Sequence, residues 1–228
     1  GTNLVKDVLS GATSSNLDRF TAVGSTLFFT ADDGVNGREL WISNGTEAGT
    51  SLLKDIAAGV SDSIGNDSEL LEVDGKLFFT ADDDLNGDEL WKSDGTAEGT
   101  VLVKDIYPGA GGNQSYFAGL VDVDGTLFFA ADDGTHGKEL WKSDGTEGGT
   151  VLVKDINPGV DGSSNPLDST PLSGINIDGT LYFSAHTEST GRELWKSDGT
   201  EAGTLLVEDV ALGTGDLDPL SLANVRSE

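Results

Sequence analysis

The chain has 228 residues, a net charge of −27 from 40 acidic and 13 basic residues, and neither cysteine nor methionine. Because so negative a chain repels phosphate, we expect no nucleic-acid partner and no binding to anionic membranes. The lack of cysteine excludes disulfides, thiol nucleophiles and thiolate zinc sites. No apolar run approaches the ~18 residues of a membrane helix, so no membrane insertion is expected. The start at Gly1, without a signal peptide, indicates a processed or excised soluble piece.

An eight-residue motif, ELWKSDGT or a close variant, recurs four times along the chain. Its tryptophans fall at positions 41, 91, 141 and 195, so the period is 50, 50 and then 54 residues. A period of this size indicates one supersecondary unit per repeat, stacked or closed into a ring. We therefore expect residues 1–228 to form a single array.

The predicted units follow one another in chain order, with an incomplete unit at each end. Residues 1–8 match the later segments 99–106 and 149–156, so they are predicted to be the outer strand of a partial blade. Complete repeats are predicted over 17–56, 67–106, 117–156 and 171–210. Residues 218–225 match 170–177 and are predicted to be the inner strand of a partial blade. A ring of four or five blades fits this pattern, as does a segment of a longer array.

The second repeat illustrates the predicted internal order. Its four strand-like runs are 70–73, 76–81, 89–93 and 100–106. Tight-turn signals such as Asp74-Gly75 join them, which predicts an antiparallel meander. Four-stranded units at this period are typical of propeller blades, so the predicted fold class is an all-β β-propeller. A β-solenoid competes, but it needs shorter repeats and fewer hairpin turns.

The repeated text LFFTADDGxxGxELWKSDGTxxGTxLVKDI resembles the ELWxxDGT repeat family of exported bacterial proteins, which are often cyanobacterial or marine. The resemblance covers nearly the whole chain. It implies a propeller-like, non-catalytic protein located outside the cell or on its surface, and it names no substrate. The fourth repeat departs from the pattern at 185–191, and the first has Asn44 where the others have Asp.

The acidic loop between the second and third predicted strands is the candidate metal site. In the second repeat it offers alternating oxygen ligands and a glycine, which is the spacing of calcium loops. The candidate ligands there are Asp82, Asp84, Asn86 and Glu89. The first and third repeats match less completely, with Asp32, Asn36 and Glu39, and with Asp132 and Glu139. The alternative is ordinary hairpin chemistry, in which aspartates accept backbone amides and glycines take positive φ.

Two other repeated features are predicted to be structural. The turn SDGTxxGT can be stabilised by its own Asp and Thr side chains, with glycine in left-handed conformations. The four motif tryptophans are predicted to lie in the core between blades, although stacking on a sugar is the alternative.

Catalysis has little support in the sequence. The two histidines, His136 and His186, belong to no recognisable triad. Carboxylate pairs recur in every repeat, whereas the catalytic pair of a glycosidase should be singular. Departures from the repeat are therefore the better candidates: the extra residues within 157–170, the loop 186–190, and Tyr107, Tyr116 and Phe117.

We therefore expect a non-enzymatic structural or ligand-presenting module of an exported bacterial protein, with calcium as a candidate stabilising ion. A multivalent lectin that binds glycans on successive blades is the alternative, and a polysaccharide-cleaving enzyme is the third hypothesis. Expected partners are a glycan or a cell-surface protein in adhesion. Self-association through the incomplete blade is a further expectation.

Overall fold

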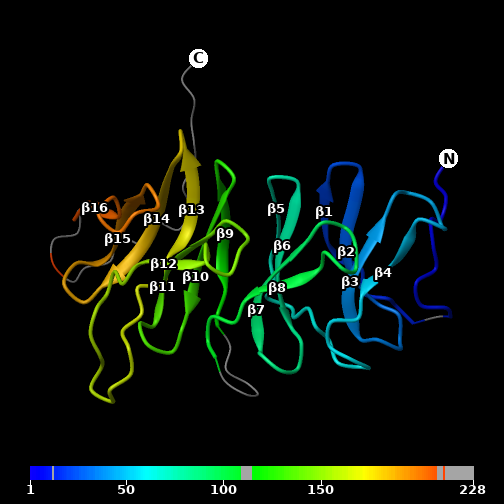
Figure 1. Ribbon diagram of the computed structural model, residues 1–228, viewed down its shortest axis with the longest axis horizontal. Helices are drawn as coiled ribbons and strands as arrows, with labels where there is room; N and C mark the ends of the chain where they lie inside the picture. The colour runs from blue at the N-terminus through cyan, green and yellow to red at the C-terminus, as the bar shows by residue number, and fades with distance from the viewer. Residues whose placement is uncertain (12, 109–114, 210–212, 214–228) are drawn as a thin grey trace. The chain divides into compact units, whose positions relative to one another are not determined.

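The chain is an all-β protein in a computed structural model that describes residues 1–11, 13–108, 115–209 and 213. The described strands form four antiparallel sheets of four strands each (Figure 1). The predicted all-β class, built from four-stranded antiparallel units, is thereby confirmed, whereas closure into a ring stays a prediction. Across these described ranges, no helix is long and apolar enough to span a membrane.

Each sheet is a meander whose strands follow one another in chain order. The first sheet contains β1 (Asp18–Val23), β2 (Thr26–Asp32), β3 (Arg38–Ser43) and β4 (Thr50–Lys54). The second contains β5 (Leu70–Val73), β6 (Lys76–Asp82), β7 (Asp88–Ser93) and β8 (Val101–Lys104). The third contains β9 (Ala118–Val123), β10 (Thr126–Asp132), β11 (Lys138–Ser143) and β12 (Val151–Lys154). The fourth contains β13 (Leu172–Ile177), β14 (Thr180–Thr187), β15 (Gly191–Ser197) and β16 (Leu205–Glu208). The first two sheets belong to one compact unit and the last two to another.

The two sheets of the first unit share one buried core. Phe28 and Leu40 of the first sheet pack in a single cluster with Phe79 and Trp91 of the second. Successive strand residues point to opposite faces, so Phe28 serves this interface while Phe29 belongs to a separate cluster. Both rings are buried, which accounts for the unbroken apolar run in the sequence of β2.

The second unit repeats this packing with equivalent residues. Phe128 and Leu140 of the third sheet share a buried cluster with Phe183 and Trp195 of the fourth. The sequence repeat is therefore also a repeat of sheet-on-sheet interfaces, one inside each unit.

A lysine at the end of the fourth strand crosses each of these interfaces. Lys54 Nζ donates to the carbonyl oxygen of Thr100 at 2.7 Å and lies 5.8 Å from the centroid of the Trp91 ring. Lys154 Nζ likewise donates to the carbonyl oxygen of Thr204 at 2.9 Å. The positive charge is held at the edge of the interface by a charge-assisted hydrogen bond and the aromatic face.

All four motif tryptophans are core residues. The exposed fractions are 5% for Trp41, 6% for Trp91, 6% for Trp141 and 7% for Trp195. The predicted core role is confirmed, and rings this deeply buried present no face for stacking on a sugar.

The amino-terminal residues make the contacts of a fourth strand but are not assigned as a strand. Residues 1–8 have no strand assignment, unlike the outer strand expected from the sequence. Lys6 Nζ nevertheless donates to the carbonyl oxygen of Thr50 at 2.8 Å, as Lys54 does to Thr100. Val8 packs on the cluster of Phe29 and Trp41. The predicted inner strand at 218–225 lies outside the described residues.

The SDGTxxGT turn is closed by its own side chains. In the second repeat, Asp94 Oδ1 accepts the N–H of Thr96 at 2.9 Å and its hydroxyl at 2.7 Å, and Thr96 Oγ1 accepts the N–H of Gly99 at 2.9 Å. The hydroxyls of Ser93 and Thr100 share a hydrogen bond of 2.8 Å. A Cβ at Gly99 would collide with the Asp94 carboxylate, so a side chain there would displace the carboxylate that closes the turn. These contacts agree with a structural role for the turn.

Candidate functional site

The acidic loops between the second and third strands of the first two sheets close on their own backbone. In the second sheet, Asp83 Oδ1 accepts the N–H of Leu85 at 3.0 Å and of Asn86 at 2.8 Å. The side-chain amide of Asn86 donates to Asp83 Oδ2 at 2.9 Å. Asp33 and Asn36 make the equivalent bonds in the first sheet. The second aspartate of the loop therefore organises it, as expected from the alternative of ordinary hairpin chemistry, in which aspartates accept backbone amides.

The corresponding loops of the third and fourth sheets are also held by hydrogen bonds within the loop, but other side chains make them. Asp133 Oδ2 and His136 Nδ1 are 2.8 Å apart, and this hydrogen bond raises the pKa of His136. In the fourth sheet, Thr187 Oγ1 accepts the N–H of Thr190 at 3.1 Å. The fourth repeat thus keeps a side-chain hydrogen bond across the loop, although His186 and Thr187 replace the two aspartates of the acidic pattern.

The predicted calcium ligands do not converge on one point. The first aspartates, Asp32, Asp82 and Asp132, each accept the backbone N–H two residues ahead, at 2.7, 2.7 and 2.8 Å. Asp84 is exposed, with φ of 63°. The amide groups of Asn36 and Asn86 donate to Asp33 and Asp83 instead. In the described part of the chain, no group of three or more His or acidic residues could hold a metal ion. Calcium binding stays a prediction.

The predicted glutamate ligands are buried on the opposite face of the sheet. Glu39, Glu89 and Glu139 are each 0% exposed. Glu39 Oε2 accepts the N–H of Ile56 at 3.1 Å and the hydroxyl of Ser63 at 2.5 Å. These donors come from the segment after β4 and from the loop before β5. Glu39 therefore joins the end of one repeat to the beginning of the next.

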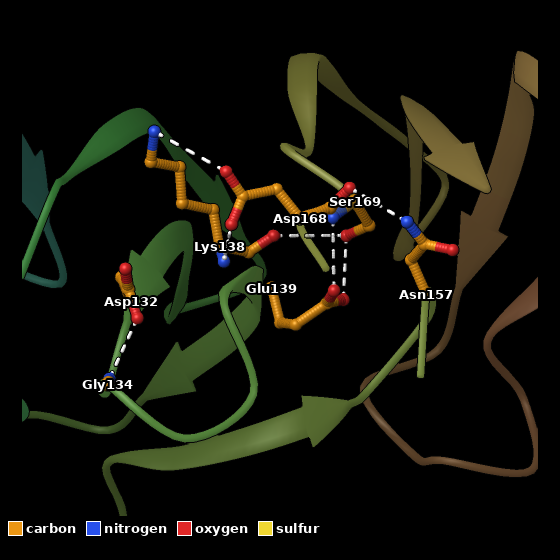
Figure 2. A network of polar contacts seen from close by, with 7 residues as sticks. All are labelled: Asp132, Gly134, Lys138, Glu139, Asn157, Asp168 and Ser169. Carbon is orange, nitrogen blue, oxygen red and sulfur yellow. Dashed lines mark hydrogen bonds and ion pairs between the residues drawn. The ribbon is translucent and has the colours of Figure 1, made fainter. Parts of the chain in front are cut away.

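Figure 2 shows the equivalent arrangement around Glu139, with Asp132 directed away from it toward Gly134. Glu139 Oε2 accepts the hydroxyl of Ser169 at 2.6 Å, and Oε1 accepts its backbone N–H at 3.1 Å. Asp168 Oδ1 accepts the backbone N–H of Lys138 at 2.9 Å. The network is therefore a clamp that fastens the loop before β13 to β11.

Burial raises the pKa of Glu39 and of Glu139 to about 7, against the hydrogen bonds that lower it. A carboxyl group with such a pKa is a candidate general acid. Both side chains are wholly buried, however, so no substrate reaches them. We therefore assign these glutamates to the fold and not to a reaction.

One accessible carboxylate pair breaks the symmetry of the repeats. Asp82 of β6 lies opposite Asp88 of β7 in the strand register. At the same register position the other sheets place a cation: Asp32 faces Arg38, Asp132 faces Lys138, and His186 faces Arg192. Asp82 and Asp88 are both half-buried. Burial, followed by the charges of Asp82 and Asp67, raises the pKa of Asp88.

This pair was missed in the sequence because neither residue is unusual by itself. The loop spacing predicts Asp82 as a calcium ligand, and Asp88 is one more acid in an acidic chain. The available signal was the alignment of the repeats, where Asp88 replaces the Arg or Lys that precedes Glu-Leu-Trp elsewhere.

No protein-family model and no curated protein matches the chain. Among solved structures, a puromycin hydrolase is similar at 17% identity, over 88% of this chain and 29% of that one, with a TM-score of 0.49. A GH43 protein of a Bacteroides ovatus xyloglucan locus has 14% identity over 88% of this chain and 42% of that one, with a TM-score of 0.39. A GH43 β-xylosidase/α-arabinofuranosidase from a compost metagenome has 12% identity over 86% and 77%, with a TM-score of 0.35. The chain thus spans less than a third of the puromycin hydrolase.

These similar structures are hydrolases, and that finding corrects the function expected from the sequence. The prediction of a non-enzymatic structural or ligand-presenting module, with a lectin as its alternative, is wrong by this comparison.

Proposed function

We propose that the chain is a polysaccharide-cleaving hydrolase in which Asp82 and Asp88 act on the glycosidic bond. The observation that carries the proposal is the opposed, solvent-accessible pair of carboxyl groups in the second sheet. Glycoside hydrolysis needs two carboxyl groups in different protonation states, and the environment of Asp88 favours its protonated form.

The register of the pair determines which mechanism we propose. Residues directly opposite on antiparallel strands have Cβ atoms ~5 Å apart and point to the same face. Retaining glycosidases keep their carboxyl groups ~5–5.5 Å apart, whereas inverting enzymes need more space for a water molecule. We therefore infer a retaining reaction.

Each aspartate then has a defined role. Asp88 transfers its proton to the leaving glycosidic oxygen while the carboxylate of Asp82 bonds to the anomeric carbon. Water next cleaves this ester, and Asp88 takes the proton of that water. The N–H of Asp84, which donates to Asp82 Oδ1 at 2.7 Å, holds the nucleophile in place.

The test is the release of reducing ends from a panel of neutral and acidic polysaccharides. We expect hydrolysis by the wild-type chain and a loss of at least about 100-fold in Asp88→Asn and in Asp82→Asn. Asp132→Asn is the matched control, because Asp132 makes the same loop contact but faces Lys138. Its activity should remain that of the wild type.

Two results would overturn the proposal. One is the absence of hydrolysis across the panel by a folded chain. The other is activity that persists in both Asp82→Asn and Asp88→Asn. The location outside the cell that the repeat resemblance implies belongs to this proposal, because structural polysaccharides are encountered there.

A further inference from the structure

A groove of about 500 Å³ lies on the face of the first sheet that carries Phe29, Ala31 and Trp41, here named the Trp41 face. This face corresponds to the face of the second sheet that carries Trp91, the Trp91 face, on which the first sheet packs. The lining comes from residues 3–8 and from the first sheet, so the groove lies within the first unit. A mainly apolar groove of this size is typical of a small-molecule site. Its apolar side chains include those of Leu4, Val5, Val8, Leu17, Phe20 and Phe29.

Phe20 provides an aromatic surface in this groove. Its ring stacks on Phe29, with 5.9 Å between the ring centroids and 20° between the ring planes, and Phe20 is 59% exposed. At the equivalent position the other sheets have half-buried Leu70, Leu120 with 9% exposure, and Gly174. The first repeat thus keeps its larger apolar side chain exposed. Because Phe20 lines the groove, a planar ring bound there can extend the stack.

The charge of the groove is opposite to that of the chain. Of the described residues that line it, only Lys6 carries a charge. Lys6 Nζ donates to the carbonyl oxygen of Thr50 at 2.8 Å, and no carboxylate of the described ranges forms an ion pair with it. An ammonium group has three N–H donors, so two remain for a ligand. In a chain of net charge −27, this groove is suited to an anion.

Two acidic residues that the other repeats share are absent beside this groove. The SDGT turn has aspartate in the other three repeats but Asn44 in the first, and Asn44 lines the groove. The turn after the first strand begins with aspartate in the other three but with Gly24 in the first, next to the lining residue Ser25. Asn44 Oδ1 still accepts the N–H of Thr46 at 3.1 Å and its hydroxyl at 2.7 Å. The exchange therefore removes a negative charge and keeps the turn.

Lys6 and Asn44 lie at the same turn of the first sheet. Lys6 binds the carbonyl oxygen of Thr50, and the backbone N–H of Asn44 donates to the neighbouring carbonyl oxygen of Gly49 at 3.1 Å. The ammonium group of Lys6 and the side-chain amide of Asn44 therefore border the same part of the groove. A carboxylate, with two acceptor oxygens, can bind both donors.

We propose that this groove binds a small aromatic carboxylate, with its ring against Phe20 and its carboxylate at Lys6 and Asn44. The apolar lining removes the ring from water, and the two donors hold the carboxylate by charge-assisted hydrogen bonds. Neither Asp82 nor Asp88 lines the groove, so this site does not depend on the proposed hydrolase activity.

The test is the binding of naphthoate to the whole chain, measured by calorimetry at neutral pH and about 0.15 M salt. Naphthamide is the matched ligand, because it has the same rings and a neutral amide in place of the carboxylate. We expect naphthoate to bind with a Kd of about 1 mM or lower. Naphthamide should bind at least about 10-fold more weakly, because it lacks the attraction to Lys6.

Asn44→Asp is the most direct variant, because it restores the aspartate of the other repeats at a turn that accepts it. It should weaken naphthoate binding about 10-fold and leave naphthamide binding unchanged, and Lys6→Met should do the same. Phe20→Ser should weaken the binding of both ligands. Asp94→Asn is the control, since it makes the reverse exchange in the second repeat and should bind naphthoate like the wild type.

Three results would overturn the proposal. One is the absence of detectable naphthoate binding to the folded wild-type chain. Another is an Asn44→Asp variant that binds naphthoate as tightly as the wild type, which would place the carboxylate elsewhere. The third is decanoate binding that is tighter than naphthoate binding, because the occupant would then be an aliphatic acid and Phe20 would not hold an aromatic ring.

Discussion

The Trp91 face and the Trp41 face are made of nearly the same residues, yet they differ in what covers them. A complete four-stranded sheet packs on Trp91, whereas Trp41 is packed by its own sheet and residues such as Val8. The exposed fractions are nevertheless nearly equal, 5% for Trp41 and 6% for Trp91, so the same burial is reached with and without a neighbouring sheet. The two covers differ in construction, because residues 1–8 form no strand. Such a cover should adjust more readily when a side chain is removed, and paired substitutions measure that difference.

The tryptophans themselves should give the largest difference. We expect Trp91→Ala to cost about 3–5 kcal/mol, because it empties the centre of a closed interface. Trp41→Ala should cost less, because residues 1–8, which help to cover it through Val8, form no strand and can move into the space left. Urea midpoints of the two variants make the comparison, with Trp195→Ala as a second closed-interface case. Equal losses for Trp41 and Trp91 would contradict the proposed asymmetry.

The apolar residues two positions after Lys54 and Lys6 should show the same difference in stability on a smaller scale. Ile56 is 8% exposed in the Trp91 cluster, and half-buried Val8 holds the equivalent place beside Trp41. Ile56→Ala should cost about 2–4 kcal/mol and Val8→Ala about 1 kcal/mol. Thermal melts at one concentration provide the measurement. A larger loss for Val8 would show that residues 1–8 are a full substitute for a sheet.

The buried glutamates Glu39 and Glu139, which join one repeat to the next, should make the free energy of unfolding depend on pH. The folded-state pKa of Glu39 and Glu139 is about 7, above the usual 4.5. The folded chain therefore binds more protons than the unfolded chain between these values. The free energy of unfolding should fall as the pH rises from 4.5 to 7, by up to about 3 kcal/mol for each glutamate.

The double variant Glu39→Gln with Glu139→Gln tests this assignment. It should flatten the slope of unfolding free energy between pH 4.5 and 7, although each Gln loses acceptors and lowers stability overall. Asp133, whose pKa is lowered, titrates below this window and should leave it unaffected. An unchanged slope in the double variant means that other groups cause the pH dependence.

The lysines should give the smallest difference. Lys54→Met removes a hydrogen bond to Thr100 and a contact with the Trp91 ring, so we expect a loss of about 1–2 kcal/mol. Lys6→Met removes a bond of similar length to Thr50 at the open face and should cost less than about 1 kcal/mol. Chemical denaturation with both variants side by side distinguishes the two. A greater effect of Lys6 would count against the ranking of the two faces.

The four-stranded units could be predicted from the sequence because turn residues act locally and recur at the same positions in every repeat. The loop spacing places Glu89 among the predicted calcium ligands because it resembles a calcium loop, whereas strand alternation turns Glu89 away from Asp82. Its hydrogen-bond donors, such as the N–H of Ile106, lie 17 residues further on. A hydrogen-bond partner so far along the chain depends on how the next segment packs, and the local sequence pattern does not indicate it. The Asp82–Asp88 pair depends on hairpin register, which only a comparison of the repeats could have indicated.

The self-closed SDGTxxGT turn has a consequence for how this kind of gene can change in length. Because Asp94 and Thr96 satisfy the turn within its own few residues, an extra copy brings all of its turn contacts with it. Recombination between copies can therefore lengthen or shorten the array by whole periods without creating a faulty junction. A chain in which residues 55–104 are duplicated should accordingly fold, with a melting temperature no lower than that of the original. A turn of this kind therefore tolerates the gain or loss of whole repeats more readily than changes within a repeat.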